Sequence, residues 1–530
     1  MRTHYCGEVG ESLAGRTIEA AGWVHRRRDH GGVIFVDLRD RSGLLQVVFD
    51  PDTPEAFESA SHLGREYCIQ VQGKLRARPA GTGNANLTSG QVELLAAKLV
   101  ILNPSATPPF SLDEEVGEEL RLKYRYIDLR RDVMQERLRR RHAISRAMRE
   151  YLDDHHFVDI ETPMLTKATP EGARDYLVPS RTHPGKFFAL PQSPQIFKQL
   201  LMMSGFDRYY QIVRCFRDED LRADRQPEFT QVDVEMSFPR VDTVVDLIEP
   251  LFVRLCALVG AEVKQPFPRM TYAEAMERYG SDKPDLRFDM PIADVTDEMA
   301  SLGLESFPAL IAEGARARAI VLPAAGGVSG TRLRKVNEEL WLGRIVPDAR
   351  AARRPLFTLK ATDEAVANLV KKGASEAVAR RLMEKAGARK DDTVLVGIDA
   401  PKPLSMAMGI LRLEMGRELK LVDERAFRFL WVTDFPLLDF DPGTERYSSL
   451  HHPFTAPRDE DVPLLDTDPA AVRAKAYDIV LNGTEVGGGS LRIHDSALQA
   501  KIFQVLSMTE EEAKERFGFF LEALQYGTPP

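Results

Sequence analysis

The chain has 530 residues, of which 43% are hydrophobic and 28% are charged, and its formal net charge is −9. A chain of this length typically contains about three domains, and the composition excludes the disordered and fibrous classes of protein. The negative net charge argues against wrapping of nucleic acid by bulk electrostatic attraction, although local basic clusters such as Arg26–Arg28 remain.

The cysteine content and the amino terminus indicate the cellular environment. The four cysteines lie far apart and form no Cys-x-x-Cys pair, which argues against structural zinc and against a disulfide framework. The first residues lack an apolar signal core, and no apolar run approaches the length of a membrane span. We therefore expect a protein of the reducing cytoplasm without a membrane partner.

Residues 1–104 contain five short segments in which apolar and polar residues alternate. The segments are Thr17–Val24, Val33–Leu38, Leu44–Phe49, Tyr67–Leu75 and Val92–Leu102. Alternation over this length is typical of half-buried strands, and five such strands suit a small Greek-key barrel of the OB type, a fold that often binds single-stranded nucleic acid.

Four residues of the predicted barrel could contact unstacked bases. Phe35 and Gln46 would lie on neighbouring strands, with Arg28 and Glu93 close to strand starts, and the set offers one stacking ring, one amide and two charges. On the residues alone, a position in the barrel core is the more common outcome for a residue such as Phe35.

A segment with three prolines, Asn103–Pro109, predicts a hinge, which we assign to residues 105–109. Helical spacing follows over residues 133–154, and then an extended run, Phe157–Pro163. Residues 286–425 alternate helix-like and strand-like stretches, which predicts a separate inserted α+β domain. Strand-like sequence returns at Phe429–Phe435.

The most informative string runs from Phe216 to Asp233. It reads as two short strands joined by a charged loop: Phe-Arg-Asp-Glu at its start and Glu-Phe-Thr-Gln-Val-Asp at its end. Charge content alone would favour a solvated surface hairpin. The full string, however, resembles motif 2 of the class II aminoacyl-tRNA synthetases, and its loop is similar to that of the bacterial aspartyl enzymes. The helix and extended run over residues 133–163 likewise resemble motif 1, which forms the dimer interface in that family.

The resemblance implies a multidomain α+β protein. It would have an OB-type anticodon-binding barrel (1–104), a hinge (105–109), an antiparallel-sheet catalytic domain in two parts (110–285 and 426–530) and the bacterial-type insertion (286–425). The implied activity is that of an aspartate–tRNA ligase, which activates L-aspartate with ATP and Mg²⁺ and transfers it to tRNA(Asp). The implied anticodon contacts are Arg28, Phe35, Gln46 and Glu93.

Activation requires the carboxylate of the amino acid to attack the α-phosphorus of ATP, so positioning and charge neutralisation should supply most of the rate. Arg217 is our candidate catalytic residue, because a guanidinium can follow charge across the phosphate oxygens. The resemblance adds ATP contacts from Asp218, Glu219, Gln226, Phe229 and Glu485.

A second string, Tyr477–His494, contains two carboxylates and three consecutive glycines. Asp478 and Glu485 are hard oxygen donors, and Mg²⁺ bound to phosphates commonly uses only one or two protein carboxylates. The glycines, Gly487–Gly489, allow close approach of the backbone to a ligand.

Recognition of aspartate requires cations where its short side chain ends, and Lys198 and Arg492 are the candidates. By resemblance, the aspartate site also includes Glu171, Ser193, Gln195, Arg217, Asp233 and His451. An acidic pocket would be expected of a lysyl enzyme instead, and the large insertion argues against an asparaginyl enzyme. These two activities remain the alternatives within the enzyme class.

The tRNA specificity is a separate question, because some enzymes of the family charge tRNA(Asn) as well. In the family, the positions occupied here by His30 and Gly81 are associated with this relaxed type. An imidazole can donate or accept a hydrogen bond, and a glycine leaves room for the loop to adjust. The alternative is that both are simply turn residues. We predict charging of both tRNAs, with a partner amidotransferase that converts the mischarged product.

Motif 3, with its Gly-x-Asp-Arg helix, does not occur before Pro530. We expect it to follow in the complete protein. The alternative, from a different functional class, is a catalytically impaired tRNA-binding paralogue that lacks motif 3.

Overall fold

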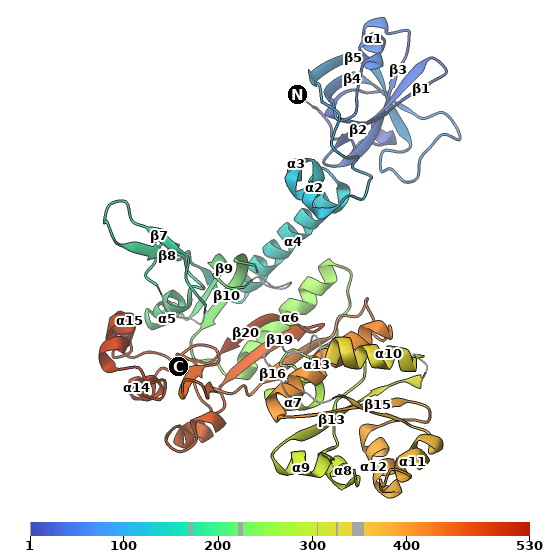
Figure 1. Ribbon diagram of the computed structural model, residues 1–530. Coiled ribbons are helices and arrows are strands. Elements are labelled where there is room, and N and C mark those ends of the chain that lie inside the picture. The colour runs from blue at the N-terminus through green and yellow to red at the C-terminus, as the bar shows by residue number, and fades with distance from the viewer. Residues whose placement is uncertain (1, 169–172, 221–225, 305, 325–326, 342–354) are drawn as a thin grey trace. The chain divides into compact units, whose positions relative to one another are not determined.

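The structure is a computed structural model, and it describes residues 2–168, 173–220, 226–304, 306–324, 327–341 and 355–530 (Figure 1). The chain divides into two compact units, one ending at Ala143 and the other beginning at Ile144. Within the described ranges, no helix is both long and apolar enough to cross a membrane.

The first unit contains a closed five-stranded barrel with the strand order β1-β2-β3-β5-β4. Its strands are β1 (Thr17–His30), β2 (Val33–Asp40), β3 (Gly43–Phe49), β4 (Cys68–Ala77) and β5 (Val92–Asn103). Alternate side chains such as Ile34, Val36 and Leu38 are buried in the core, as the period of a strand requires. The predicted OB-type barrel is confirmed. Two short helices that the alternation did not predict accompany it: η1 (Glu11–Leu13) and α1 (Pro54–Ser61).

Three helices follow the barrel: α2 (Glu118–Lys123), α3 (Arg125–Asp128) and α4 (Asp132–Asp154). Arg130 donates to Glu66 at 2.7 Å, and its guanidinium lies 5.2 Å from the ring of Trp23. Asp128 is fully buried and accepts hydrogen bonds from Arg121 and Arg125. The contacts of Arg130 join the residues after the proline-rich linker to the barrel, in keeping with a first unit that extends past residues 105–109 into α4.

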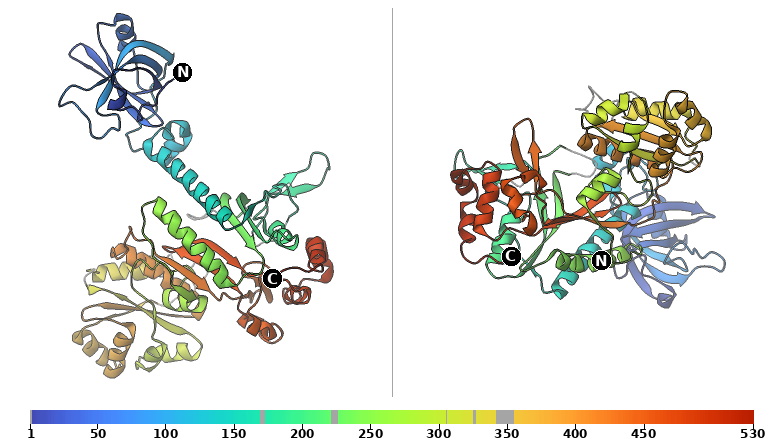
Figure 2. Two further views of the ribbon diagram at one scale, coloured as in Figure 1. Left: turned by 180° about the vertical axis from the view of Figure 1, so that it is seen from behind. Right: turned by 90° about the horizontal axis from the view of Figure 1, so that it is seen from below.

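The second unit contains two sheets that carry most of the strands outside the segment between α7 (Tyr272–Tyr279) and β16 (Phe429–Thr433) (Figure 2). One has the order β10-β9-β6 and the other the order β11-β16-β19-β20. Their strands are β6 (Val158–Asp159), β9 (Arg208–Phe216), β10 (Glu228–Met236), β11 (Arg269–Thr271), β16 (Phe429–Thr433), β19 (Ala476–Leu481) and β20 (Thr484–Ser490). The two strands expected in the motif 2 string are β9 and β10, which pair antiparallel from Phe216 opposite Glu228 to Arg208 opposite Met236.

Helices and hairpins surround these sheets. The helices are α5 (Gln195–Met203), α6 (Val241–Leu258), α7 (Tyr272–Tyr279), η5 (Asp459–Asp466), η6 (Pro469–Ala471), α14 (Ser496–Val505) and α15 (Glu510–Ala523). The hairpins pair β7 (Leu177–Pro179) with β8 (Phe187–Ala189), and β17 (Leu438–Asp441) with β18 (Arg446–Ser449). One apolar cluster joins α5, α14 and α15 to Phe454, and so fixes the loop that carries the adjacent histidines.

The segment between α7 and β16 forms an antiparallel sheet with the order β12-β13-β15-β14. Its elements are β12 (Ala293–Asp294), α8 (Thr296–Ser301), α9 (Ser306–Ala312), β13 (Arg316–Leu322), α10 (Gly330–Lys335), η3 (Val336–Trp341), β14 (Phe357–Lys360), α11 (Asp363–Val370), α12 (Glu376–Ala386), β15 (Thr393–Asp399) and α13 (Pro401–Glu418). Ile320 and Leu395 pack toward α13 on one face, whereas Ala319 and Val396 pack toward α8, α11 and α12 on the other. This segment is therefore an α+β arrangement in which helices cover both faces of the sheet.

Candidate functional site

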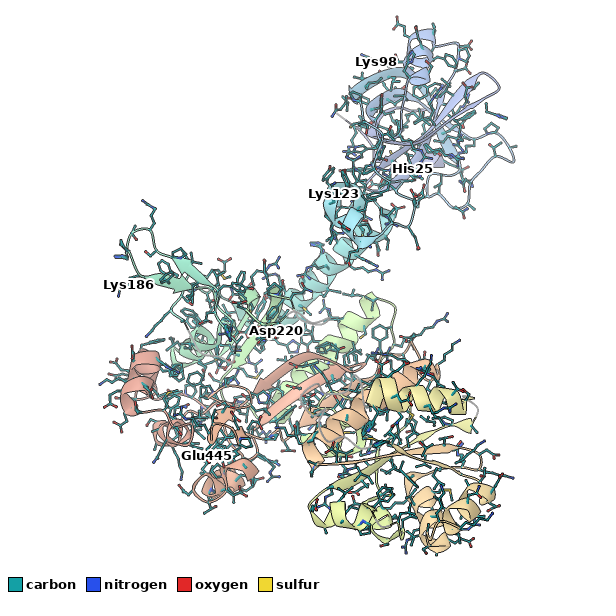
Figure 3. The ribbon with its side chains drawn as sticks, viewed as in Figure 1. His25, Lys98, Lys123, Lys186, Asp220 and Glu445 are labelled. Carbon is teal, nitrogen blue, oxygen red and sulfur yellow. The ribbon has the colours of Figure 1, made fainter. Side chains whose placement is uncertain are left out.

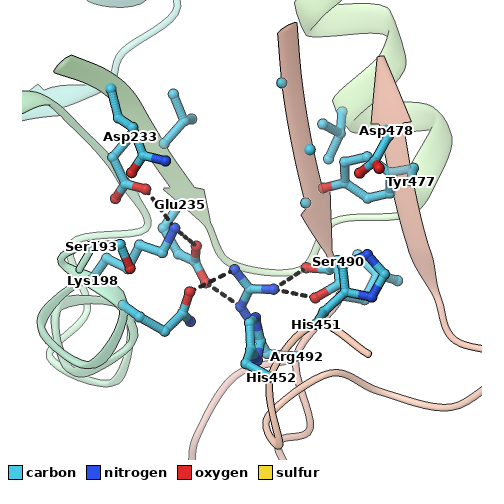
Figure 4. Close-up of a pocket in the computed structure, with 18 of the residues that line it drawn as sticks. Ser193, Lys198, Asp233, Glu235, His451, His452, Tyr477, Asp478, Ser490 and Arg492 are labelled. Atoms are coloured by element: carbon cyan, nitrogen blue, oxygen red, sulfur yellow. Dashed lines mark hydrogen bonds and ion pairs between the residues drawn. The ribbon is translucent and has the colours of Figure 1, made fainter. Parts of the chain in front are cut away.

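A cleft of about 1210 Å³ lies in the second unit, between the strands β10 and β20. Residues of α5, α6, β19 and the loop 450–457 complete its walls. Figure 4 shows the charged side chains that meet at its floor. Most of the side chains that the sequence singled out for ATP and aspartate line this one cleft.

Lys198 lies on α5 and reaches between two carboxylates of β10. Its ammonium is 2.7 Å from Asp233 Oδ1 and 3.3 Å from Glu235 Oε2, and all three side chains are buried. Burial opposes the charged ammonium, but the neighbouring carboxylates outweigh burial and raise the pKa of Lys198. The lysine is therefore a fixed cation in the floor of the cleft.

Arg492 follows β20 and enters the same network from the opposite wall. Its Nε lies 3.4 Å from Glu235 Oε1, and its Nη2 donates to Gln195 Oε1 at 3.1 Å. It also donates to the hydroxyl and carbonyl oxygens of Ser490. Glu235 thus lies between the two cations and holds them together.

Two buried atoms of this network have no hydrogen-bond partner among the described residues. They are Asp233 Oδ2 and Arg492 Nε. Buried polar atoms are nearly always satisfied in native structures, so an unsatisfied acceptor beside an unsatisfied donor in a cleft indicates a place where a ligand binds. An amino acid, which carries both an ammonium and a carboxylate, has the groups that would satisfy both atoms.

The motif 2 hairpin forms the adjacent end of the cleft. The guanidinium of Arg217 lies 5.0 Å from the centre of the Phe229 ring, and both side chains line the cleft together with Glu219 and Gln226. Asp218 does not line it; its amide donates to the carbonyl of Arg174 at 3.0 Å. The described residues exclude Glu171 and the loop 221–225, so the expected contact of Glu171 lies outside them.

The carboxylates of Asp478 and Glu485 meet in the β19–β20 hairpin, where Asp478 lies opposite Gly488. Burial, followed by the charge of Glu485, raises the pKa of Asp478 well above its ordinary value. A Cβ on Gly488 would lie 2.4 Å from Asp478 Oδ1, so only glycine leaves this carboxylate accessible from that side. Two crowded oxygen donors suit a cation such as Mg²⁺. No group of three or more possible metal-binding side chains occurs in the described part of the chain.

Two adjacent histidines, His451 and His452, also line the cleft. His451 packs edge-on against Phe435, and His452 Nδ1 accepts from the amide of Phe454 at 3.3 Å. Burial, with Arg492 second, lowers the pKa of both, and that of His452 the further. The sequence singled out only His451, whereas the structure places both imidazoles beside Arg492 in their neutral form.

The barrel carries a second, smaller pocket of about 210 Å³, lined in part by His25 (Figure 3), Arg28, Asp37 and Gln46. Arg28 donates to Asp37 at 2.6 Å and to Gln46 at 3.4 Å, and Gln46 in turn donates to Glu93 at 2.8 Å. Three of the four predicted base contacts therefore form one chain of hydrogen bonds.

The fourth, Phe35, pairs with Arg28 across the strands β1 and β2. It is half-buried between the fully buried Ile34 and Val36, so its ring lies on the outer face of the barrel. His30, the last residue of β1, and Gly81, in a turn, are both exposed and do not line the barrel pocket. Gly81 has a φ of 83°, a conformation that favours glycine.

Sequence reasoning missed Glu235, His452 and Lys283, all of which line the cleft. The alternation of β10 could have found Glu235, because Gln231, Asp233 and Glu235 are spaced two residues apart and share one face of the strand. The sequence around Lys283 shows no comparable pattern that would place it in the cleft.

The family described as tRNA synthetases class II (D, K and N) matches residues 117–530, and an OB-fold nucleic acid binding domain matches residues 18–102. The chain belongs to the class II tRNA synthetases (D, K and N).

Curated relatives of this synthetase share about half of its residues. The aspartate–tRNA(Asp/Asn) ligase of Heliobacterium modesticaldum is 49% identical over 533 residues, which cover 100% of this chain and 87% of the relative. The corresponding protein of Moorella thermoacetica is 50% identical with the same coverage. The aspartate–tRNA ligase of Staphylococcus saprophyticus is 49% identical and covered to 90%.

Among solved structures, asparaginyl-tRNA synthetase from Pyrococcus horikoshii, complexed with asparaginyl-adenylate, resembles this synthetase with a TM-score of 0.60 at 18% identity. The match covers 99% of this chain and 91% of the other. At that identity the likeness concerns the fold, which joins an OB-type barrel to a class II catalytic domain.

The lowered pKa of His452 predicts a pH-dependent stability. A histidine kept neutral in the folded state stabilises it above the unfolded pKa of about 6.5, and this stabilisation is lost as the pH falls below that value. Between pH 7.5 and pH 5.5, we expect the melting temperature of the parent to fall on the order of 2 °C further than that of His452→Asn. Calorimetry of both proteins measures the difference, and equal slopes would contradict the neutral assignment.

Proposed function

We propose that this synthetase is an aspartate–tRNA ligase, which activates L-aspartate with ATP and transfers it to tRNA. The observation that carries the proposal is the pair of cations in the floor of the cleft, the buried Lys198 and the part-buried Arg492, both held by Glu235. Together they suit the side-chain carboxylate of aspartate better than the neutral amide of asparagine or the cation of lysine. The names of the relatives support the same substrate.

In this proposal Asp233 Oδ2 accepts a hydrogen bond from the α-ammonium of aspartate, because that oxygen is buried without a partner among the described residues. Gln195 and Arg492 are already joined by a hydrogen bond and contact the side-chain carboxylate together with Lys198. Ser193 and His451 close the sides of the pocket. Glu171, outside the described residues, is proposed to contact the ammonium on the strength of the family resemblance.

Arg217 is proposed to bind the α-phosphate, where its charge follows the negative charge that develops during the attack. Its position over the Phe229 ring fixes the guanidinium next to the stacking face for adenine. Glu219 and Gln226 line the same end of the cleft and contact ATP. Asp218 is proposed to act through its backbone pairing with residue 174, which holds the start of the loop.

Asp478 and Glu485 are the proposed Mg²⁺ ligands. Burial, and then the charge of Glu485, raises the pKa of Asp478, so a cation between the two carboxylates would stabilise their charged forms. When bound, the ion would neutralise the charge of the ATP phosphates. The rest of the coordination would come from phosphate oxygens and water.

The barrel is proposed to read the anticodon through Arg28, Phe35, Gln46 and Glu93. Hydrogen bonds join Arg28, Gln46 and Glu93, and the half-buried Phe35 lies opposite Arg28 on the neighbouring strand. We propose domain boundaries at residues 1–104, 105–109, 110–285, 286–425 and 426–530.

A homodimer through α4 and β6 is supported by Val158 of β6, an apolar residue that is 45% exposed. Cytoplasmic localisation is supported by the four cysteines, none of which is in a disulfide.

Replacing Arg492 with leucine tests the aspartate pocket. In Arg492→Leu the substrate carboxylate would face a single cation next to Glu235, and breaking such a buried charge pair costs about 3–5 kcal/mol. We expect aspartate binding, measured by calorimetry, to weaken by at least about a hundredfold. The control is Arg380→Leu, whose exposed ion pairs lie outside the cleft. Unchanged aspartate affinity in Arg492→Leu would remove this residue from the pocket.

The tRNA specificity can be tested with purified transcripts of tRNA(Asp) and tRNA(Asn). We propose that His30 and Gly81 permit both, and therefore expect both transcripts to be charged, with a partner amidotransferase needed for the mischarged product. His30→Leu should lower charging of tRNA(Asn) more than that of tRNA(Asp). Discrimination by the parent of more than about a thousandfold against tRNA(Asn) would show strict specificity instead.

A further inference from the structure

A crossing segment, which we define as residues Tyr279–Met290, connects α7 of the catalytic part to the insertion. It starts at the end of α7 and leads into β12. Within it, the half-buried Lys283 lines the same cleft as Asp478, Glu485 and Arg217. The segment therefore carries a cation from the root of the insertion into the candidate active site.

The insertion holds this crossing segment through α13. Arg412 is buried to 1% exposure and donates to the carbonyl oxygens of Asp285, Phe288 and Met290 at 2.9–3.0 Å. Its guanidinium also lies 4.0 Å from the centre of the Phe288 ring, and burial lowers its pKa to about 10. One side chain of the insertion thus satisfies three backbone carbonyls that would otherwise be buried without donors.

Two further contacts hold the crossing segment in place. A Cβ on Gly409 of α13 would lie 2.4 Å from the carbonyl oxygen of Gly280, so the helix and the segment are in backbone contact. Arg287 donates to Asp285 within the segment and to Glu424, where the chain returns from the insertion. Both chain crossings are therefore tied together just beside Lys283.

The position of Lys283 within the cleft indicates which part of the substrates it faces. Lys198 and Arg492 already occupy the aspartate end, where Asp233 and Glu235 neutralise them. Lys283 instead lies at the hairpin end of the cleft: a Cβ on Gly483, in the turn between β19 and β20, would lie 3.1 Å from Asp285 Cβ, so the crossing segment packs against the turn that leads from Asp478 to Glu485. Bound ATP would bring several negative charges to this carboxylate end, where a cation is needed.

We propose that Lys283 is a further substrate-contacting residue of this synthetase, whose ammonium binds the β- and γ-phosphates of ATP while α13 of the insertion holds it in position. The proposal rests on the proposed function, since it names a contact to one of its substrates. It also gives the insertion a role in the active site, because Arg412, Arg287 and Gly409 fix the segment that carries the lysine.

The test compares Lys283→Met, Lys283→Arg and the parent by calorimetry with three probes: a non-hydrolysable ATP analogue, AMP and aspartate. We expect the analogue to bind about tenfold more weakly to Lys283→Met, a loss of about 1.4 kcal/mol. AMP and aspartate should bind as to the parent, because AMP lacks the two outer phosphates. Lys283→Arg should retain most of the affinity. Lys402→Met, which removes an exposed lysine of α13 outside the cleft, is the control.

Two outcomes would overturn the proposal: unchanged affinity for the analogue in Lys283→Met, or an equal loss for AMP and the analogue. Failure of the parent itself to bind aspartate and the analogue would instead count against the proposed function, so the two failures are distinguishable.

The positioning role has a separate readout in a double-mutant cycle. Arg287→Met should weaken binding of the ATP analogue by several-fold and leave AMP unaffected. Added to Lys283→Met, it should cause no further loss, because both changes remove the same contact. Fully additive losses would contradict positioning of Lys283 by the crossing segment.

Discussion

The buried network of Lys198, Asp233, Glu235 and Arg492 is the constraint on which the site depends. Two cations and two carboxylates lie together in a cleft floor where each alone would carry a large desolvation cost. Their pairing is possible only if α5, β10 and the end of β20 meet at one point. The strand pairing, the glycines of β20 and the aromatic cluster behind the histidine loop all serve to bring these elements together.

The same network explains how the protein can keep these charges in the cleft without substrate and still select its amino acid. Glu235 lies between the cations and prevents their repulsion, but Asp233 Oδ2 and Arg492 Nε remain without a hydrogen-bond partner in the described structure. The charges are therefore balanced, whereas the hydrogen-bonding capacity is not. A ligand that supplies both an ammonium and a carboxylate completes the network, and a ligand without the side-chain carboxylate leaves Arg492 Nε without a hydrogen-bond acceptor, which is costly.

Much of this arrangement could be predicted from the sequence. Alternating strands predicted the barrel, and long motif strings singled out Arg217, Phe229, Asp478 and Arg492, all of which line one cleft. Glu235 was missed although the period of β10 places it beside Asp233. Lys283 could not be predicted in this way, since its place depends on Arg412, which is more than a hundred residues away in the chain and acts through backbone carbonyls. The short helix α1 was missed because its eight residues, about two turns of helix, leave little periodicity.

The central claim is that the two cations held by Glu235 select aspartate by its side-chain charge. The most direct measurement is the ratio of the dissociation constants for asparagine and aspartate on the parent protein, determined by calorimetry in the presence of the ATP analogue. The account predicts that aspartate binds at least about a hundredfold more tightly, since the amide of asparagine carries no charge to pair with Lys198 and Arg492. Equal affinities for the two amino acids would contradict it.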